Sequence, residues 1–187
     1  MKEKTTSYLY QSVTDIQNTI RAFDVKLGFL FMVIFLPLAG LKDLVPQLQV
    51  LIDKNLYMAL LSASFISWLF ALYFLFLGVR PINNSKESIE GDAPKGTFYA
   101  GGLYTFQGID YFWNFPIKTN NDMKDFISSL PKNDDDIHKE LVFEIHKLAY
   151  IRDVKAKRTT ACIYSILVLG FISVLTITLV TLKIGGL

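Results

Sequence analysis

Two long apolar runs without any charged side chain dominate the pattern of this chain. They are residues 56–79 (LYMALLSASFISWLFALYFLFLGV) and residues 159–182 (TTACIYSILVLGFISVLTITLVTL). A helix crosses a bilayer core of about 30 Å with about 20 apolar residues. The pattern therefore predicts membrane-spanning helices at 57–79 and 159–182.

A third apolar run, residues 27–41, is shorter. A buried helix of a soluble domain is the alternative for a run of this length. Lys26 and Lys42 flank the run and can extend their ammonium groups to lipid headgroups. The preceding residues already have a helical pattern, so we expect a first span at 24–42.

Two amphipathic segments precede the first and last spans. Residues 7–24 place apolar side chains at spacings of 4, 3, 4 and 3, and residues 137–151 do so at 4, 4 and 3. We expect these segments to pair as a small helical core. The second should continue unbroken into the membrane, from about residue 136 to 182, with Asp134–Asp136 supplying its N-cap.

The predicted fold is an all-α membrane protein with three transmembrane helices and a small cytoplasmic helical domain. The last helix is long and continues into the membrane. The predicted parts are a cytoplasmic amphipathic helix (1–23), a transmembrane hairpin (24–79, with residues 42–55 as its loop), a cytoplasmic domain (80–158) and a third span (159–182).

Lys and Arg are distributed unevenly around the spans, which predicts the orientation. The densest cluster is Arg152, Lys155, Lys157 and Arg158, directly before the last span, whereas only Lys183 follows it. The N-terminus and residues 80–158 are therefore expected in the cytoplasm and the C-terminus outside. Residues 80–158 carry 12 Lys/Arg and 12 Asp/Glu, a balance that argues against a surface for duplex nucleic acid.

Small and polar side chains form stripes on two spans. Ala59, Ala63, Ser67 and Ala71 recur every four residues on the second span, a pattern that allows transmembrane helices to approach closely. Ser165, Ser173 and Thr176 lie within one quadrant of the last span. These hydroxyls either bond the carbonyls of their own helix or line a pore between subunits.

Enzyme chemistry has little support in the sequence. His138 and His146 lack a cysteine partner and an HExxH pattern, and no nucleophile elbow or phosphate-binding glycine loop is present. We therefore expect no enzyme, no metal site and no cofactor. The aromatic, glycine-rich stretch 96–115 either caps the helical pair or offers aromatic faces to a base.

The order of several short motifs resembles the transmembrane effectors of bacterial cyclic-nucleotide anti-phage systems, the Pycsar effector family. These motifs are Asp24 and Lys26 at the mouth of the first span, Gly78-Val79-Arg80-Pro81, Phe98-Tyr99-Ala100-Gly101-Gly102 with Asp110-Tyr111-Phe112, and Ile145-His146-Lys147-Leu148-Ala149-Tyr150-Ile151.

The resemblance implies an inner-membrane protein that is gated by a nucleotide second messenger from a partner cyclase or nucleotidyltransferase. When released, such an effector breaks the membrane barrier of the infected cell. A homo-oligomer, with a tetramer favoured, is expected to form the ion channel. The alternatives are a channel held closed by an oligonucleotide, as in Hailong-type defence, a constitutive small channel, and a membrane anchor that docks a partner.

A cyclic nucleotide or short oligonucleotide is the ligand that this reading implies. Its phosphates are expected at Arg152, Lys155, Lys157 and Arg158, with His146 and Lys147 farther up the same helix, and its base at Phe98, Tyr99 and Tyr104. In the competing account, the basic residues only follow the topology rule and contact lipid headgroups.

Overall fold

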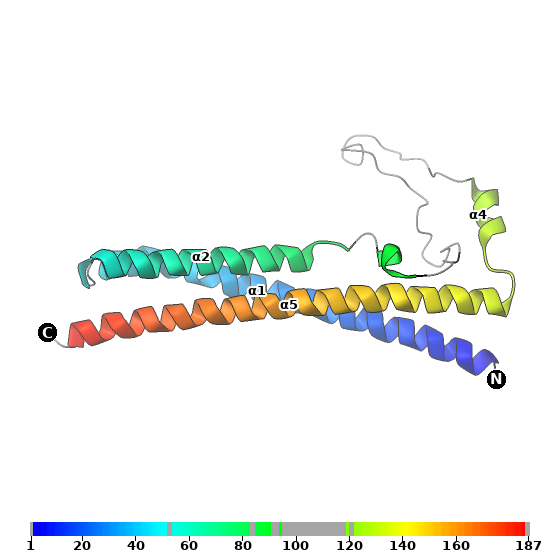
Figure 1. Ribbon diagram of the computed structural model, residues 1–187, viewed down its shortest axis with the longest axis horizontal. Helices are drawn as coiled ribbons and strands as arrows, with labels where there is room; N and C mark the ends of the chain where they lie inside the picture. Colours follow the sequence, from blue (N-terminus) through cyan, green and yellow to red (C-terminus); the bar gives the residue numbers. More distant parts are fainter. Residues whose placement is uncertain are drawn as a thin grey trace. The chain divides into compact units, whose positions relative to one another are not determined.

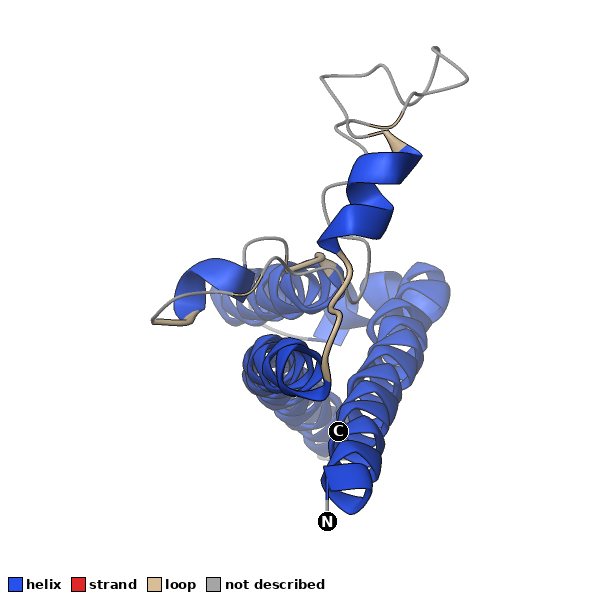
Figure 2. Cartoon of the chain, turned by 90° about the vertical axis from the view of Figure 1, so that its right-hand side faces the viewer, coloured by secondary structure: helices blue, strands red, loops and turns tan. Residues whose placement is uncertain are grey.

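The computed structural model describes residues 2–51, 54–82, 85–90, 94, 119 and 122–185. The described residues form the helices α1 (Lys2–Leu51), α2 (Lys54–Val79), α4 (Met123–Ser129) and α5 (Asp134–Gly185) and the short 3-10 helix η1 (Ser85–Ser88) (Figure 1). Within these ranges no strand occurs (Figure 2). The all-helical prediction is therefore confirmed for the described part of the chain.

The chain divides into two compact units. Unit 1 comprises Met1–Asn18 and Asn83–Arg152, and unit 2 comprises Thr19–Ile82 and Asp153–Leu187. The long helices α1 and α5 contribute to both units.

The helix α5 runs unbroken for 52 residues, as its sequence predicted. Its N-cap, however, is Asn133 and not the three aspartates. The Asn133 side chain accepts a hydrogen bond from the Asp136 amide at 2.8 Å, and its main-chain carbonyl accepts from the Ile137 amide at 3.1 Å. Asp134, Asp135 and Asp136 form the first turn, where their negative charges complement the helix dipole.

The segment 42–55 is not the loop that the sequence interpretation assumed. Helix α1 extends to Leu51, and α2 begins at Lys54. Leu41, Leu44, Leu48 and Leu51 recur at spacings of 3, 4 and 3, a helical period that the charges at Lys42 and Asp43 obscured. The connection between the two helices is therefore much shorter than predicted.

In unit 1, α5 packs on the N-terminal part of α1. Val13 of α1 and Leu141 of α5 are buried, as the two amphipathic patterns predicted, and Phe143, which lies outside the predicted pattern, is buried as well. Thr6 Oγ1 and His138 Nε2 lie 2.7 Å apart in a hydrogen bond between the two helices. The predicted pairing of these helices is confirmed.

The covered face of α1 has a seven-residue repeat. It comprises eight buried or half-buried residues: Leu9, Val13, Ile16, Ile20, Phe23, Leu27, Leu30 and Ile34. Their alternating spacing of 4 and 3 is the period of coiled-coil packing. The stripe that the sequence showed at 9–23 thus continues to Ile34.

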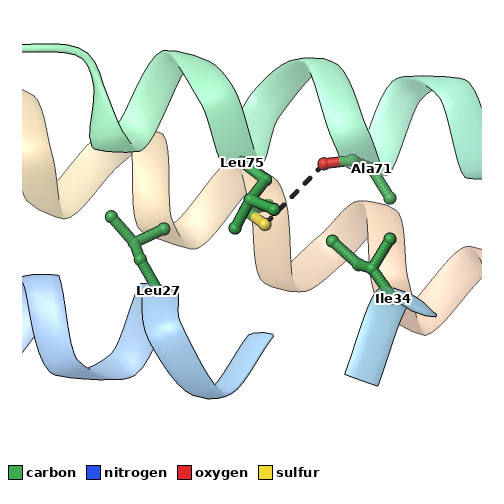
Figure 3. Close-up of a cluster of buried hydrophobic side chains, with 5 residues drawn as sticks. Leu27, Ile34, Ala71 and Leu75 are labelled. Atoms are coloured by element: carbon green, nitrogen blue, oxygen red, sulfur yellow. Dashed lines mark hydrogen bonds between the residues drawn. The ribbon is translucent and has the colours of Figure 1, made fainter. Parts of the chain in front are cut away.

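In unit 2, three helices enclose a small apolar core, with α2 antiparallel to α1 and α5 (Figure 1). Leu27 and Ile34 of α1, Ala71 and Leu75 of α2 and Cys162 of α5 form this core (Figure 3). A Cβ atom added to Gly78 would lie 2.9–3.0 Å from the Leu27 methyl groups. The helices therefore approach closely because Ala71 and Gly78 have so little side chain.

The described residues contain two helices that are long and apolar enough to cross a membrane, α2 at Met58–Val79 and α5. Only 17% and 11% of their most apolar windows are buried within the chain. A core helix of a soluble protein would be mostly covered by its own fold, so these surfaces fit lipid or a second subunit. The span at 24–42 stays a prediction.

Leu27→Ala should destabilise the protein by about 2–4 kcal/mol, because it empties the centre of the unit 2 core. Leu36→Ala is the matched control, since Leu36 lies on the same helix and is 73% exposed. Thermal unfolding in detergent, followed by circular dichroism, should show a lower Tm for the first variant alone. Equal Tm values would contradict this account of the core.

Candidate functional site

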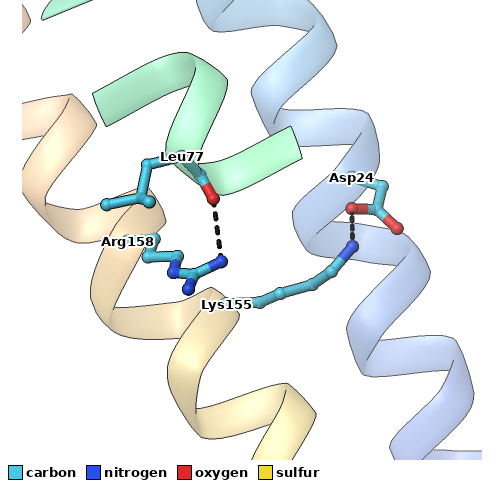
Figure 4. A network of polar contacts seen from close by, with 4 residues as sticks. All are labelled: Asp24, Leu77, Lys155 and Arg158. Carbon is cyan, nitrogen blue, oxygen red and sulfur yellow. Dashed lines mark hydrogen bonds and ion pairs between the residues drawn. The ribbon is translucent and has the colours of Figure 1, made fainter. Parts of the chain in front are cut away.

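A set of polar contacts connects the three helices of unit 2, and we name it the polar junction. It consists of Asp24 of α1, Leu77 of α2, and Lys155 and Arg158 of α5 (Figure 4). Lys155 Nζ donates to Asp24 Oδ1, and Arg158 Nη1 donates to the Leu77 carbonyl oxygen at 2.9 Å. Lys155 and Arg158 are three residues apart, so one turn of α5 contacts both neighbouring helices.

The two contacts of the polar junction have different electrostatic roles: one pairs a buried positive charge, and the other bonds a free carbonyl at a helix end. Lys155 is buried (9% exposed), and a buried ammonium is costly unless a counter-charge pairs with it. Asp24 supplies that charge while its side chain stays 48% exposed. Arg158 satisfies one of the last carbonyls of α2, which the helix itself cannot bond, and its charge complements the negative helix end.

The predicted phosphate ligands have different surroundings. Lys155 and Arg158 are already engaged in the polar junction. Arg152 is half-buried and has an interaction of its own, whereas Lys157 is exposed. Lys147 pairs with the buried Glu144 and lies 5.2 Å from the centre of the Phe143 ring. Phosphate binding by this cluster stays a prediction, and Lys155 and Arg158 would have to exchange an existing partner for a phosphate.

His146 lies in unit 1 at a pocket that the sequence reasoning did not find. The pocket has a volume of about 500 Å³, and its lining residues are Ser88, Ile89, Glu90, His146, Ala149 and Tyr150. His146 and Tyr150 are one turn apart on α5. The four-residue spacing of the two rings is a sequence signal, but the tertiary structure alone brings them to the polar segment 88–90.

The small-residue stripe of α2 has two parts. Ala71 is fully buried in the unit 2 core and Ser67 is 8% exposed, whereas Ala59 and Ala63 are exposed. The close helix approach that the stripe predicted thus occurs within the chain at Ala71. A contact between subunits at Ala59 and Ala63 stays a prediction.

The predicted pore-lining hydroxyls bond the carbonyls of their own helix. Ser165 donates to Ala161 at 3.0 Å, Ser173 to Leu169 at 2.9 Å and Thr176 to Ile172 at 2.8 Å. Each hydroxyl proton is therefore satisfied, and the oxygen lone pairs remain as weak acceptors. Their role in lining a pore is not tested by these bonds.

The remaining predicted residues fall into two groups. At the mouth of the predicted first span, Asp24 belongs to the polar junction, and Lys26 Nζ lies 5.6 Å from the centre of the Phe23 ring. Phe98, Tyr99 and Tyr104 lie outside the described residues. Within the described ranges, no group of three or more His, Cys, Asp or Glu could hold a metal ion.

The pairing of Asp24 with Lys155 can be measured with a double-mutant cycle of Asp24→Asn and Lys155→Met. We expect a coupling energy of about 1–3 kcal/mol, between the values for exposed and buried pairs, because only the lysine is buried. Thermal unfolding in detergent gives the four stabilities. Additive effects of the two substitutions would show that the pair contributes nothing to the helix packing.

A comparison with known protein families identifies a family for this chain. A family model described as the Pycsar effector protein domain matches residues 8–183, which include nearly all of the described helices. No curated protein and no solved structure matches the chain. The matched region includes most of both units, the polar junction and the pocket of unit 1. The chain therefore belongs to the Pycsar effector family, and it is a membrane effector of anti-phage defence.

Proposed function

We propose that this protein is a nucleotide-gated effector whose subunits assemble into an ion-conducting channel in the bacterial inner membrane. Opening of the channel would depolarise the infected cell and stop its growth. The observation that carries the proposal is the apolar outer surface of unit 2, together with the family to which the chain belongs.

All three helices of unit 2 expose large apolar side chains, which supports three spans. On α1 these include Phe29, Met32 and Leu36, with exposed fractions of 65%, 70% and 73%. Phe65 and Phe76 of α2 and Phe171 and Val174 of α5 are similarly exposed. Water would disfavour a surface of this kind on every helix, whereas lipid chains match it. We therefore propose that α1 crosses the bilayer at 24–42 beside α2 and α5.

The core of unit 2 argues that conduction needs several subunits. Leu27, Ile34 and Leu75 fill the space between the three helices, so one copy leaves no aqueous path there. A channel must then form between copies, and we propose a tetramer. Ala59 and Ala63 supply an exposed small-residue surface on α2 where a second copy could approach closely.

The signal is proposed to act from the cytoplasm. The Lys/Arg distribution supports this side for the N-terminus and residues 80–158, and the outside for the C-terminus. The nucleotide comes from a partner cyclase or nucleotidyltransferase and binds in this part of the chain. Its binding would change the equilibrium between closed and open oligomers, to the extent that it favours one of them.

Planar-bilayer recordings of the purified protein test the channel. We expect discrete conductance steps that depend on a cyclic nucleotide added on the cytoplasmic side. Conductance that is present without a signal and is blocked by a short oligonucleotide would show that the signal closes the channel instead of opening it. Bilayers that stay silent under all conditions would contradict the channel and support a membrane anchor.

Ala63→Leu should weaken assembly, because a large side chain prevents close approach of the α2 helices. Ser62→Leu is the matched control, since it adds the same side chain at the neighbouring exposed position on another side of α2. Native mass spectrometry in mild detergent should show fewer oligomers for Ala63→Leu only. A wild type that is monomeric in this measurement would refute the oligomer.

A further inference from the structure

We propose that the unit 1 pocket at His146 and Tyr150 binds the nucleoside part of the signal, with its phosphate left outside. This inference rests on the proposed nucleotide gating and assigns the position and chemistry of its binding site. It differs from the sequence prediction, which placed the base at an aromatic segment and His146 at a phosphate.

The pocket is an open hollow, since Ser88, Glu90, His146 and Tyr150 are exposed, and it is large enough for a small ligand. Its volume of about 500 Å³ lies within the range of roughly 300–1,000 Å³ that is usual for such sites. One wall comes from α5, where the small side chain of Ala149 lies in the turn between His146 and Tyr150. The other comes from the connector after α2, with Ser88, Ile89 and Glu90.

The polar groups of the connector wall are acceptors. Ser88 Oγ donates its proton to the Ser85 carbonyl at 2.6 Å, so its lone pairs remain for a ligand. The Glu90 carboxylate accepts hydrogen bonds only. A ligand that fills the pocket should therefore bring N–H or O–H donors, such as a ribose hydroxyl or the amino group of a base.

The same carboxylate disfavours a phosphate inside the pocket. A phosphate also carries negative charge and offers mainly acceptors, so it would face Glu90 with like charge. The α5 wall instead offers two aromatic rings, and Tyr150 is 41% exposed. Any of the common bases can stack on such a ring, because every base has a flat π-face. Donor hydrogens and a flat ring together describe a nucleoside.

Two substitutions probe the pocket in different ways. Ala149→Leu fills the pocket with a good helix former, and Glu90→Gln removes the carboxylate charge outside any long helix. The control is Val142→Leu, at a position on the same helix that is 42% exposed and does not line the pocket. Size-exclusion profiles and thermal unfolding establish that each variant is folded.

The experiment is equilibrium dialysis of the 187-residue chain in lipid nanodiscs. The probes are tritiated 3′,5′-cyclic nucleotides of adenine, cytosine, guanine and uracil, each tested alone. We expect the wild type and Val142→Leu to retain at least one of them with affinities within about twofold of each other. Ala149→Leu and Glu90→Gln should each weaken its retention by about tenfold or more. The free nucleoside should compete, and inorganic phosphate should not.

The outcomes separate the two proposals. If both pocket variants retain a nucleotide as well as the wild type does, the pocket assignment is overturned and nucleotide gating is left intact. Competition by phosphate but not by nucleoside also overturns the assignment. A wild type that retains none of the four nucleotides overturns the assignment together with gating by a cyclic nucleotide.

Discussion

The packing of unit 2 depends on one turn of α5, where Lys155 and Arg158 contact two different helices. At this turn the polar half of α5 gives way to its apolar half. A charge so close to an apolar region is costly unless it is paired, so the available partners decide which helices lie beside it. Asp24 on α1 and the carbonyl end of α2 are those partners. The junction therefore fixes both neighbours of α5 at the same turn.

Beyond this turn, packing is apolar and relies on shape. Lipid chains are as apolar as the side chains, so burial alone gives the helices little reason to associate, and close contact must provide it. Ala71 and Gly78 permit that contact with Leu27 and the rest of the core. Two polar side chains of this region bond nearby carbonyls: Trp68 Nε1 donates to the Ile34 carbonyl at 3.1 Å, and Cys162 Sγ lies 3.9 Å from the Ala71 carbonyl. This pattern is what the absence of water requires.

Unit 1 differs from unit 2 in its packing, because its helices also carry charged and polar side chains at their contacts and at an open pocket. Glu144 is buried beside Lys147, and His138 hydrogen-bonds to Thr6. Its pocket combines a carboxylate, a hydroxyl and aromatic rings within a few residues of the predicted cytoplasmic cluster of basic residues. The proposed recognition of a small signal in unit 1 and the apolar helices of unit 2 together fit the family's role as a membrane effector.

The sequence by itself determined the elements that depend on local pattern. The charge-free runs identified α2 and the apolar half of α5, and the apolar spacing identified the pairing face of α1 with Val13 and of α5 with Leu141. These follow from chain length and helical period, which need no knowledge of neighbours. The extension of α1 to Leu51 was also present in the spacing of its leucines, but the nearby charges concealed it.

Only the tertiary structure decided which partners the polar residues take. Lys155 reads in the sequence as one of four equivalent cations before a span, yet it is buried against Asp24, 131 residues away along the chain. Glu90 belongs to none of the short motifs, and the motif that contains Tyr150 does not name a partner for it. The two residues line one pocket because the connector after α2 lies beside α5. Hydrogen bonds and ion pairs depend on distances of a few ångströms between distant segments, and a local pattern does not contain those distances.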